Sequence, residues 1–188
     1  MPILFDQLQF VFWSITYILI IFYTINRKSI GIPPFAISLN FAWETASVFY
    51  DLFLGGVNYF HIIWFALDAV IVLLFFVWCK PLYFQSKYIF ALVYLLALFV
   101  IVPLFFKTDF GMLISSFTLD FIMAIEYLFY VINDMDYCVL SSCICITKFL
   151  GDFFAWLFYL TNIIVFVLGI IVQFVNLACI FCLIKKRV

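Results

Sequence analysis

The chain has 188 residues, of which 70% are hydrophobic, 23% aromatic and only 10% charged. Soluble domains are about 45–50% apolar and about 25% charged, so this composition excludes a soluble globular protein and indicates an integral membrane protein. The formal net charge is −1 and the one basic cluster is Lys185-Lys186-Arg187, so we expect the lipid bilayer, and no nucleic acid, as a partner.

Seven apolar stretches are each long enough for a membrane-spanning helix, which needs about 20 residues. In chain order, the predicted spans are 8–26, 34–55, 59–79, 88–106, 110–133, 137–160 and 162–184. Pro33-Pro34 would begin the second span, since proline is tolerated in a first helical turn, and Gly55-Gly56 would end it. The first stretch lacks a basic start and a small-residue cleavage pattern, which predicts a membrane span rather than a signal peptide. Residues 1–188 are therefore expected to form a single domain, an all-α seven-helix bundle.

The basic residues predict the orientation of this bundle, because cytoplasmic loops carry an excess of Lys and Arg. With seven spans, one side receives Arg27, Lys28, Lys80, Lys87, Lys185, Lys186 and Arg187. The other side receives only Lys107. The C-terminus is therefore expected in the cytoplasm and the N-terminus outside.

Polar side chains recur on five of the spans at spacings of three, four and seven residues, so each set shares one helix face. Lipid cannot solvate such groups, and we expect these faces to turn toward one another around a polar, aromatic-walled centre. The sets are Asn40, Glu44, Ser47 and Asp51; His61, Trp64 and Asp68; Ser116, Asp120 and Tyr127; Ser141, Cys145, Lys148, Asp152 and Tyr159; and Asn162, Gly169, Gln173 and Asn176.

Acids at mid-span are the strongest indication of a functional site, because a charge at bilayer depth costs about 2.5–3.5 kcal/mol on insertion scales. Lys148 and Asp152 lie four residues apart and are expected to form a structural ion pair. Glu44, Asp68 and Asp120 then have no cationic partner, and burial with mutual repulsion should keep at least one of them protonated at neutral pH. A neutral, buried carboxylic acid can donate a proton to a substrate.

Other notable side chains have plainer interpretations. Glu126 lies about 240° around its helix from Asp120, and is expected to face another cavity or a subunit contact. His61 lies near the outer edge of its span, which favours a histidine at the membrane interface. Cys143 and Cys145 would point about 200° apart, so we expect neither a metal site nor a disulfide framework.

The run Leu39-Asn40-Phe41-Ala42-Trp43-Glu44, followed by Trp64 and Asp68 on the next span, resembles a motif of the small seven-span terpene cyclases of fungal meroterpenoid and indole-diterpene pathways. Chain size, span count and Phe149-Leu150-Gly151 in the sixth span extend the resemblance. It implies a metal-independent enzyme of the isomerase or lyase type, which needs no cofactor. Such an enzyme protonates an epoxide or alkene of a lipophilic isoprenoid, and successive double bonds then capture the carbocation.

The resemblance also assigns roles to the residues of this motif. It implies that Glu44 belongs to the acid machinery and that Asn40 orients its carboxyl. Trp43 and Trp64 would wall the substrate cavity and stabilise cations through their ring faces.

The last span departs from the pattern of that family. The family uses an acidic residue there, whereas this chain carries Gln173 and Asn176. Either Asp68 or Asp120 takes the role of that acid, or the chain has a different substrate or activity. Tyr127, Gln173 and Asn176 complete the substrate-binding residues expected from the inward-facing stripes.

Other functions remain open alternatives. Intramembrane carboxylates also serve proton or cation coupling, which makes a small transporter or channel the main alternative, although the sequence shows neither interrupted helices nor repeat symmetry. Lys148 lies on the sixth span rather than the last, which disfavours a retinal-binding protein. Asn133-Asp134-Met135-Asp136 could hold Mg²⁺ in a prenyl-diphosphate enzyme, but no second acidic cluster accompanies it. A structural or assembly subunit without chemistry is a further alternative, and the oligomeric state is left open.

Overall fold

The computed structural model describes residues 2–30, 32–78, 84–107, 110–133, 141–160 and 162–187, and in these ranges the chain is all α-helical. The helices are α1 Pro2–Arg27, α2 Pro34–Phe53, α3 Tyr59–Trp78, α4 Phe84–Lys107, α5 Gly111–Ile132, α6 Ser142–Phe158 and α7 Ile163–Arg187. The predicted all-α seven-helix class is therefore confirmed. The helix α1 begins six residues before the predicted span, and the predicted start of the sixth span at 137 lies outside the described residues.

Five of these helices, α1, α3, α4, α5 and α7, are long and apolar enough to cross a membrane. The chain is thus a multi-pass integral membrane protein. The other two described helices are not in this group, since α6 has only 17 residues and α2 carries the polar stripe that includes Asn40 and Glu44.

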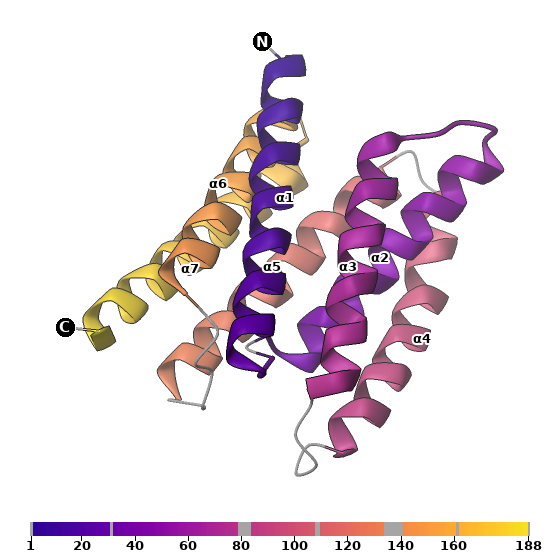
Figure 1. Ribbon diagram of the computed structural model, residues 1–188. Helices are drawn as coiled ribbons and strands as arrows, with labels where there is room; N and C mark the ends of the chain where they lie inside the picture. Colours follow the sequence, from indigo (N-terminus) through magenta and orange to yellow (C-terminus); the bar gives the residue numbers. More distant parts are fainter. Residues whose placement is uncertain are drawn as a thin grey trace.

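The helices form a ring in which each helix packs against two neighbours. Around the ring, the order is α1, α3, α2, α4, α5, α7, α6 and back to α1 (Figure 1). In addition, α2 contacts α5 directly. The centre is therefore enclosed by six helices, and α4 covers α2 and α5 from outside.

Aromatic contacts hold α4 against α2. The ring of Tyr94 stacks on Phe41 with centroids 5.4 Å apart, and its hydroxyl donates to Thr45 Oγ1 at 3.3 Å. Phe105 makes an edge contact with Trp43, with centroids 6.0 Å apart. Trp43, which faces the centre of the ring, is therefore supported from outside by α4.

A tight reversal joins α2 to α3. The N–H of Gly56 donates to the carbonyl of Asp51 at 3.0 Å, and the N–H of Gly55 donates to the carbonyl of Leu52 at 3.1 Å, which is the Schellman pattern of a helix end. Gly55 has φ +73°, a conformation that side chains with a Cβ rarely adopt. The reversal brings the start of α3 beside the last turn of α2.

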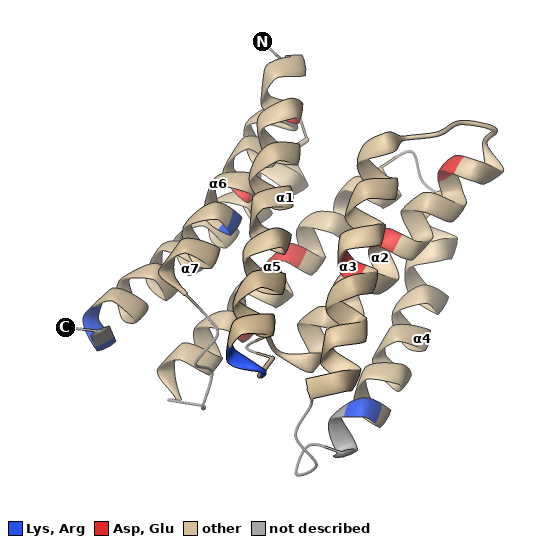
Figure 2. Cartoon of the chain, in the orientation of Figure 1, with Lys and Arg blue, Asp and Glu red and all other residues tan. Residues whose placement is uncertain are grey.

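Charged residues are distributed unevenly over the bundle (Figure 2). Basic residues lie at the end of α1, near the start of α4 and at the end of α7, and these helix ends share one end of the molecule, whereas Lys107 ends α4. Acidic residues lie at mid-height on α2, α3 and α5, and α6 carries one acidic and one basic residue near its middle. The buried charged residues of the bundle are therefore mainly acidic.

Candidate functional site

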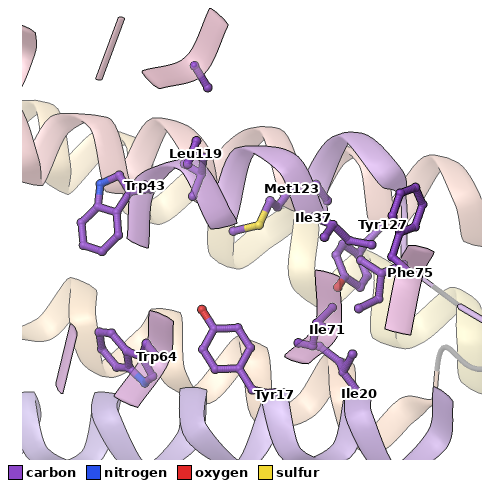
Figure 3. Packing of buried hydrophobic residues seen from close by; sticks show 14 of the residues in the cluster. Tyr17, Ile20, Ile37, Trp43, Trp64, Ile71, Phe75, Leu119, Met123 and Tyr127 are labelled. Atoms are coloured by element: carbon purple, nitrogen blue, oxygen red, sulfur yellow. The ribbon is translucent and has the colours of Figure 1, made fainter. Parts of the chain in front are cut away.

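A cavity of about 430 Å³ lies inside the ring, which is within the range of about 300–1,000 Å³ typical of ligand sites. Its wall comes from α1, α2, α3, α5 and α6 and from the segments that precede α3, α5 and α7. Trp43 and Trp64 lie on opposite sides of the open space, and the hydroxyl of Tyr17 points into it (Figure 3). The expected aromatic-walled centre is therefore present.

The cavity reaches the surface at one end of the bundle. Asp6, Asn58, Phe110 and Asn162 line it there, at or just before the beginnings of α1, α3, α5 and α7. Asn58 and Phe110 are exposed. We call this end the mouth; it lies opposite the basic ends of α1 and α7 (Figures 1 and 2).

Glu44 lies in the cavity wall with only 3% of its surface exposed. Its Oε1 accepts a hydrogen bond from the hydroxyl of Tyr17 at 3.3 Å, whereas Oε2 is buried without a hydrogen-bond partner among the described residues. The hydroxyl of Tyr17 accepts from Asn40 Nδ2 at 2.8 Å, and the same amide donates to Asp68 Oδ2 at 2.7 Å. A chain of hydrogen bonds therefore links the two acids.

This chain changes the role expected for Asn40. No hydrogen bond joins Asn40 to Glu44 among the described side chains, so an orienting role of Asn40 would be indirect. Tyr17 contacts the carboxyl of Glu44, and Asn40 acts on it only by holding the tyrosine hydroxyl.

The other predicted acids lie in two different places. Asp120, 9% exposed, lines the same cavity as Glu44. Asp68, 2% exposed, instead lines a smaller space of about 30 Å³ behind Tyr17, together with Tyr127. Contrary to the expectation of one central site, the structure brings Glu44 and Asp120 together and leaves Asp68 and Tyr127 in the neighbouring space.

Lys148 and Asp152 form a buried ion pair within α6, with Nζ and Oδ2 2.5 Å apart. Asn176 Nδ2 donates to the same carboxylate oxygen at 2.7 Å, and the Lys148 ammonium lies 5.2 Å from the centre of the Trp13 ring. Lys148 also interacts electrostatically with Asp120. Neither Asp120 nor Glu44 forms an ion pair with the described residues, as expected, although Asp120 has this cation in its vicinity.

Two residues expected to bind substrate lie elsewhere. Asn176 is bonded to Asp152, and Gln173 is buried on α7 with neither amide atom hydrogen-bonded to the described residues. Neither residue lines the cavity or the smaller space. Gln173 lies one turn beyond Gly169, where a Cβ would be only 2.1 Å from the ring of Trp156. The polar face of α7 therefore packs against α6 rather than facing the cavity.

The two tryptophans of the motif are fixed by hydrogen bonds. Trp43 donates its indole N–H to Ser115 Oγ on α5 at 3.1 Å, and Trp64 donates to Ser14 Oγ on α1 at 3.3 Å. Because both N–H groups are satisfied by serines, the rings present mainly carbon surface to the cavity.

Four of the lining residues missed in the sequence come from one face of α1. Asp6, Gln9, Trp13 and Tyr17 all line the cavity, at spacings of three, four and four residues. This spacing places the four residues on one helix face, as on five other spans, so the sequence alone could have identified them. Trp13 approaches α6 closely because position 151 is glycine, where a Cβ would lie 2.7 Å from the indole.

His61 lines the cavity near its mouth and is 9% exposed, and its place at the membrane interface stays a prediction. Its Nδ1 lies 2.6 Å from Asp51 Oδ2, and its ring meets Trp43 edge-on with centroids 5.8 Å apart.

The remaining expectations concern residues away from the cavity. Glu126 is half-buried and lines neither space. Cys143 is exposed whereas Cys145 is buried, with its sulfur 3.8 Å from that of Cys179. No three His, Cys, Asp or Glu side chains gather as a metal site in the described ranges. Most of the acidic run 133–136 lies outside the described residues.

No protein-family model, curated protein or solved structure matches this chain. The resemblance seen in the sequence therefore stays a hypothesis, and function is inferred from the geometry of the cavity.

Proposed function

We propose that the protein is a membrane-embedded enzyme that protonates a lipophilic isoprenoid and lets the resulting carbocation cyclise, in the manner of a terpene cyclase. The observation that carries this proposal is the position of Glu44. Its carboxyl is nearly fully buried in the wall of an aromatic cavity, with one oxygen held by Tyr17 and the other without a described protein partner. The proton itself is the catalyst, so the chemistry requires neither metal nor cofactor.

Glu44 is the proton donor in this proposal, and it is uncharged before the reaction. An unpaired carboxylate removed from water is strongly disfavoured relative to the neutral acid. Because Oε1 accepts the hydrogen bond from Tyr17, the acid proton resides on Oε2. That oxygen delivers the proton to an epoxide oxygen or an alkene carbon of the substrate.

The cavity wall then stabilises the positive charge. Trp13, Trp43 and Trp64 line it, and each ring face within reach of a cation contributes about 0.5–2 kcal/mol. Asp120 lines the same cavity as Glu44 and presents the oxygens of a second carboxyl group to the carbocation. The aromatic side chains exclude water from the cavity. Water therefore does not capture the cation before the rings of the product have formed.

In this proposal all seven helices span the bilayer, with the N-terminus outside. The polar groups that make α2 less apolar, Ser38, Asn40, Glu44 and Ser47, are buried rather than exposed to lipid. The basic ends of α1 and α7 lie together, as the positive-inside rule requires of a cytoplasmic face. The mouth of the cavity then opens on the outer side.

The shape of the interior favours a cyclase over a proton- or cation-coupled transporter. A transporter needs a polar path from its binding site to each side of the membrane, even if only one path is open at a time. Behind Tyr17 and Asn40 lies the smaller space of about 30 Å³. Asp68 and Lys148 line it, but most of its other lining residues are apolar: Ile20, Ile32, Ala36, Ile37, Ile71 and Met123. The polar cavity therefore has an opening at the mouth and narrows sharply behind Tyr17.

The proposal is tested with the variant Glu44→Gln in purified protein, supplied with linear polyprenyl compounds with and without a terminal epoxide. Wild-type protein should form cyclic isomers that contain one deuteron when the reaction is run in heavy water. Glu44→Gln should abolish turnover, while membrane insertion and thermal unfolding stay close to wild type. Glu126→Gln is the matched control and should retain activity, because Glu126 lines neither space. Wild-type turnover by Glu44→Gln would rule out the acid role.

A further inference from the structure

His61 and Asp51 form a hydrogen-bonded pair near the mouth, and the protonation step uses neither residue. Nδ1 of His61 lies 2.6 Å from Oδ2 of Asp51, with side-chain exposures of 11% and 20%. The glycine reversal at Gly55 brings the two residues together from adjacent helices. A histidine oriented by a carboxylate in a cavity wall is a typical arrangement for accepting a proton.

The second ring nitrogen of His61 is the one left for a ligand. In the neutral tautomer whose Nδ1 donates to the Asp51 carboxylate, Nε2 carries the lone pair, and no described residue is hydrogen-bonded to Nε2. The imidazole lies against Trp43 at 5.8 Å and Trp64 at 6.4 Å between ring centroids. These are the two rings that wall the cavity, so a cation held between them is near the imidazole.

We infer that His61 accepts the proton that ends the cyclisation, and that Asp51 is its positioning residue; this rests on the proposed function. A C–H bond next to the final cationic carbon breaks, its electron pair forms a C=C bond, and the proton moves to Nε2. The carboxylates of Asp51 and of Asp6, which interacts electrostatically with His61 from α1, stabilise the imidazolium. The proton leaves to water at the mouth and Glu44 regains one, so the product is an isomer of the substrate.

The donor Glu44 and the positioning residue Asp51 are separated along α2. They are seven residues apart, which places them on one face and about 10 Å apart along the helix axis. His61, which is bonded to Asp51, lies at the start of α3 near the mouth. A proton is therefore delivered deep in the cavity and removed nearer its mouth, and the new double bond is expected away from the atom that was protonated.

The test compares the products of wild-type protein and His61→Gln. The variant should still consume substrate, but its alkene product should fall at least tenfold and be replaced by alcohols in which water captured the cation. His61→Ala should lose the alkene in the same way, and added imidazole should restore it because the site is open at the mouth. Asp51→Asn should also lower the alkene product in favour of alcohols, whereas Asp51→Glu, which keeps the carboxylate, should retain the alkene. This difference between the two variants is not expected if Asp51 only contributes to packing.

The outcomes distinguish failure of this inference from failure of the proposed function. Unchanged alkene yield from His61→Gln, with wild-type turnover intact, overturns the inference alone. Complete loss of substrate consumption in folded His61→Gln also overturns it, because His61 would then be needed before the final step. If His61→Gln does not fold, the product ratio of Asp51→Asn decides. Absence of cyclisation by wild-type protein overturns both the function and the inference.

Discussion

Tyr17 of α1 donates a hydrogen bond to Oε1 of Glu44 on α2, and through this contact the first helix controls the proposed acid. The same hydroxyl accepts from Asn40, so rotation of the tyrosine would break two hydrogen bonds at once. Both partners of the contact are buried. The tyrosine therefore determines which carboxyl oxygen remains available to a substrate.

Tyr17→Phe should lower turnover at least tenfold. The substitution keeps the ring but removes both hydrogen bonds, so Glu44 loses its orientation and a buried Asn40 donor is left unsatisfied. The unsatisfied donor should reduce the free energy of unfolding by about 1–3 kcal/mol. Turnover and thermal denaturation in detergent measure the two effects. Tyr23→Phe on the same helix is the control, since Tyr23 forms no hydrogen bond with the described residues; equal turnover in both variants would contradict the role of Tyr17.

The two remaining acids should respond differently to amide substitution. Asp120→Asn should reduce turnover at least tenfold, because the second carboxyl group is lost from the cavity that contains Glu44. Asp68→Asn should have a smaller effect, since Asp68 lies in the smaller space and the substituted amide can still accept from Asn40. Steady-state rates of the two variants decide this, and a larger loss for Asp68→Asn would reverse the assignment.

Gly151→Ala should change both stability and products. The new Cβ would lie 2.7 Å from the Trp13 ring, and overpacking of this kind costs about 1–3 kcal/mol. Displacement of Trp13 alters the cavity wall, so the product distribution should shift. Gly169→Ala provides the comparison: its Cβ would meet Trp156 at 2.1 Å, but Trp156 does not line the cavity. Both variants should melt at lower temperature, and only Gly151→Ala should change the products.

Lys148→Met should destabilise the protein by about 3–5 kcal/mol, because it leaves the Asp152 carboxylate buried without its cation. Adding Asp152→Asn should restore much of this loss, since the substituted amide is neutral and can still accept from Asn176. Thermal denaturation of the single and double variants is the measurement. A double variant as unstable as Lys148→Met would show that the ion pair is not the source of the loss.

The proposed seven spans would place the two termini on opposite faces of the membrane. Epitope tags at the N- and C-termini should therefore differ in their accessibility in sealed vesicles, with the C-terminal tag on the cytoplasmic face. Tags accessible from the same face would indicate an even number of spans.

Helix positions were largely predictable from the sequence, because a membrane span must be a run of apolar residues of fixed minimum length. The start of α1 was not, since Asp6 interrupts the apolar run before the predicted start at residue 8. The structure shows that the Asp6 side chain lines the cavity. A polar residue near a span end is therefore a poor guide to where the helix begins.

The cavity was partly predictable. Periodicity identifies which side chains share a face, and it correctly grouped Glu44 with Asn40, and His61 with Trp64. It does not determine which faces meet, because the order of helices around the ring depends on packing between distant segments. For this reason Asn176 was expected in the cavity, whereas it is hydrogen-bonded to Asp152 on α6.

The position of α4 outside the enclosing helices has a consequence for how such a protein can diversify. None of its described residues lines the cavity, yet Phe105 supports Trp43 and Tyr94 supports Phe41 from behind. Substitutions on α4 can therefore shift the aromatic wall by fractions of an ångström without altering any group that meets the substrate. Selection or engineering can thus retune the shape of the reaction chamber from its outer layer while the acid remains the same.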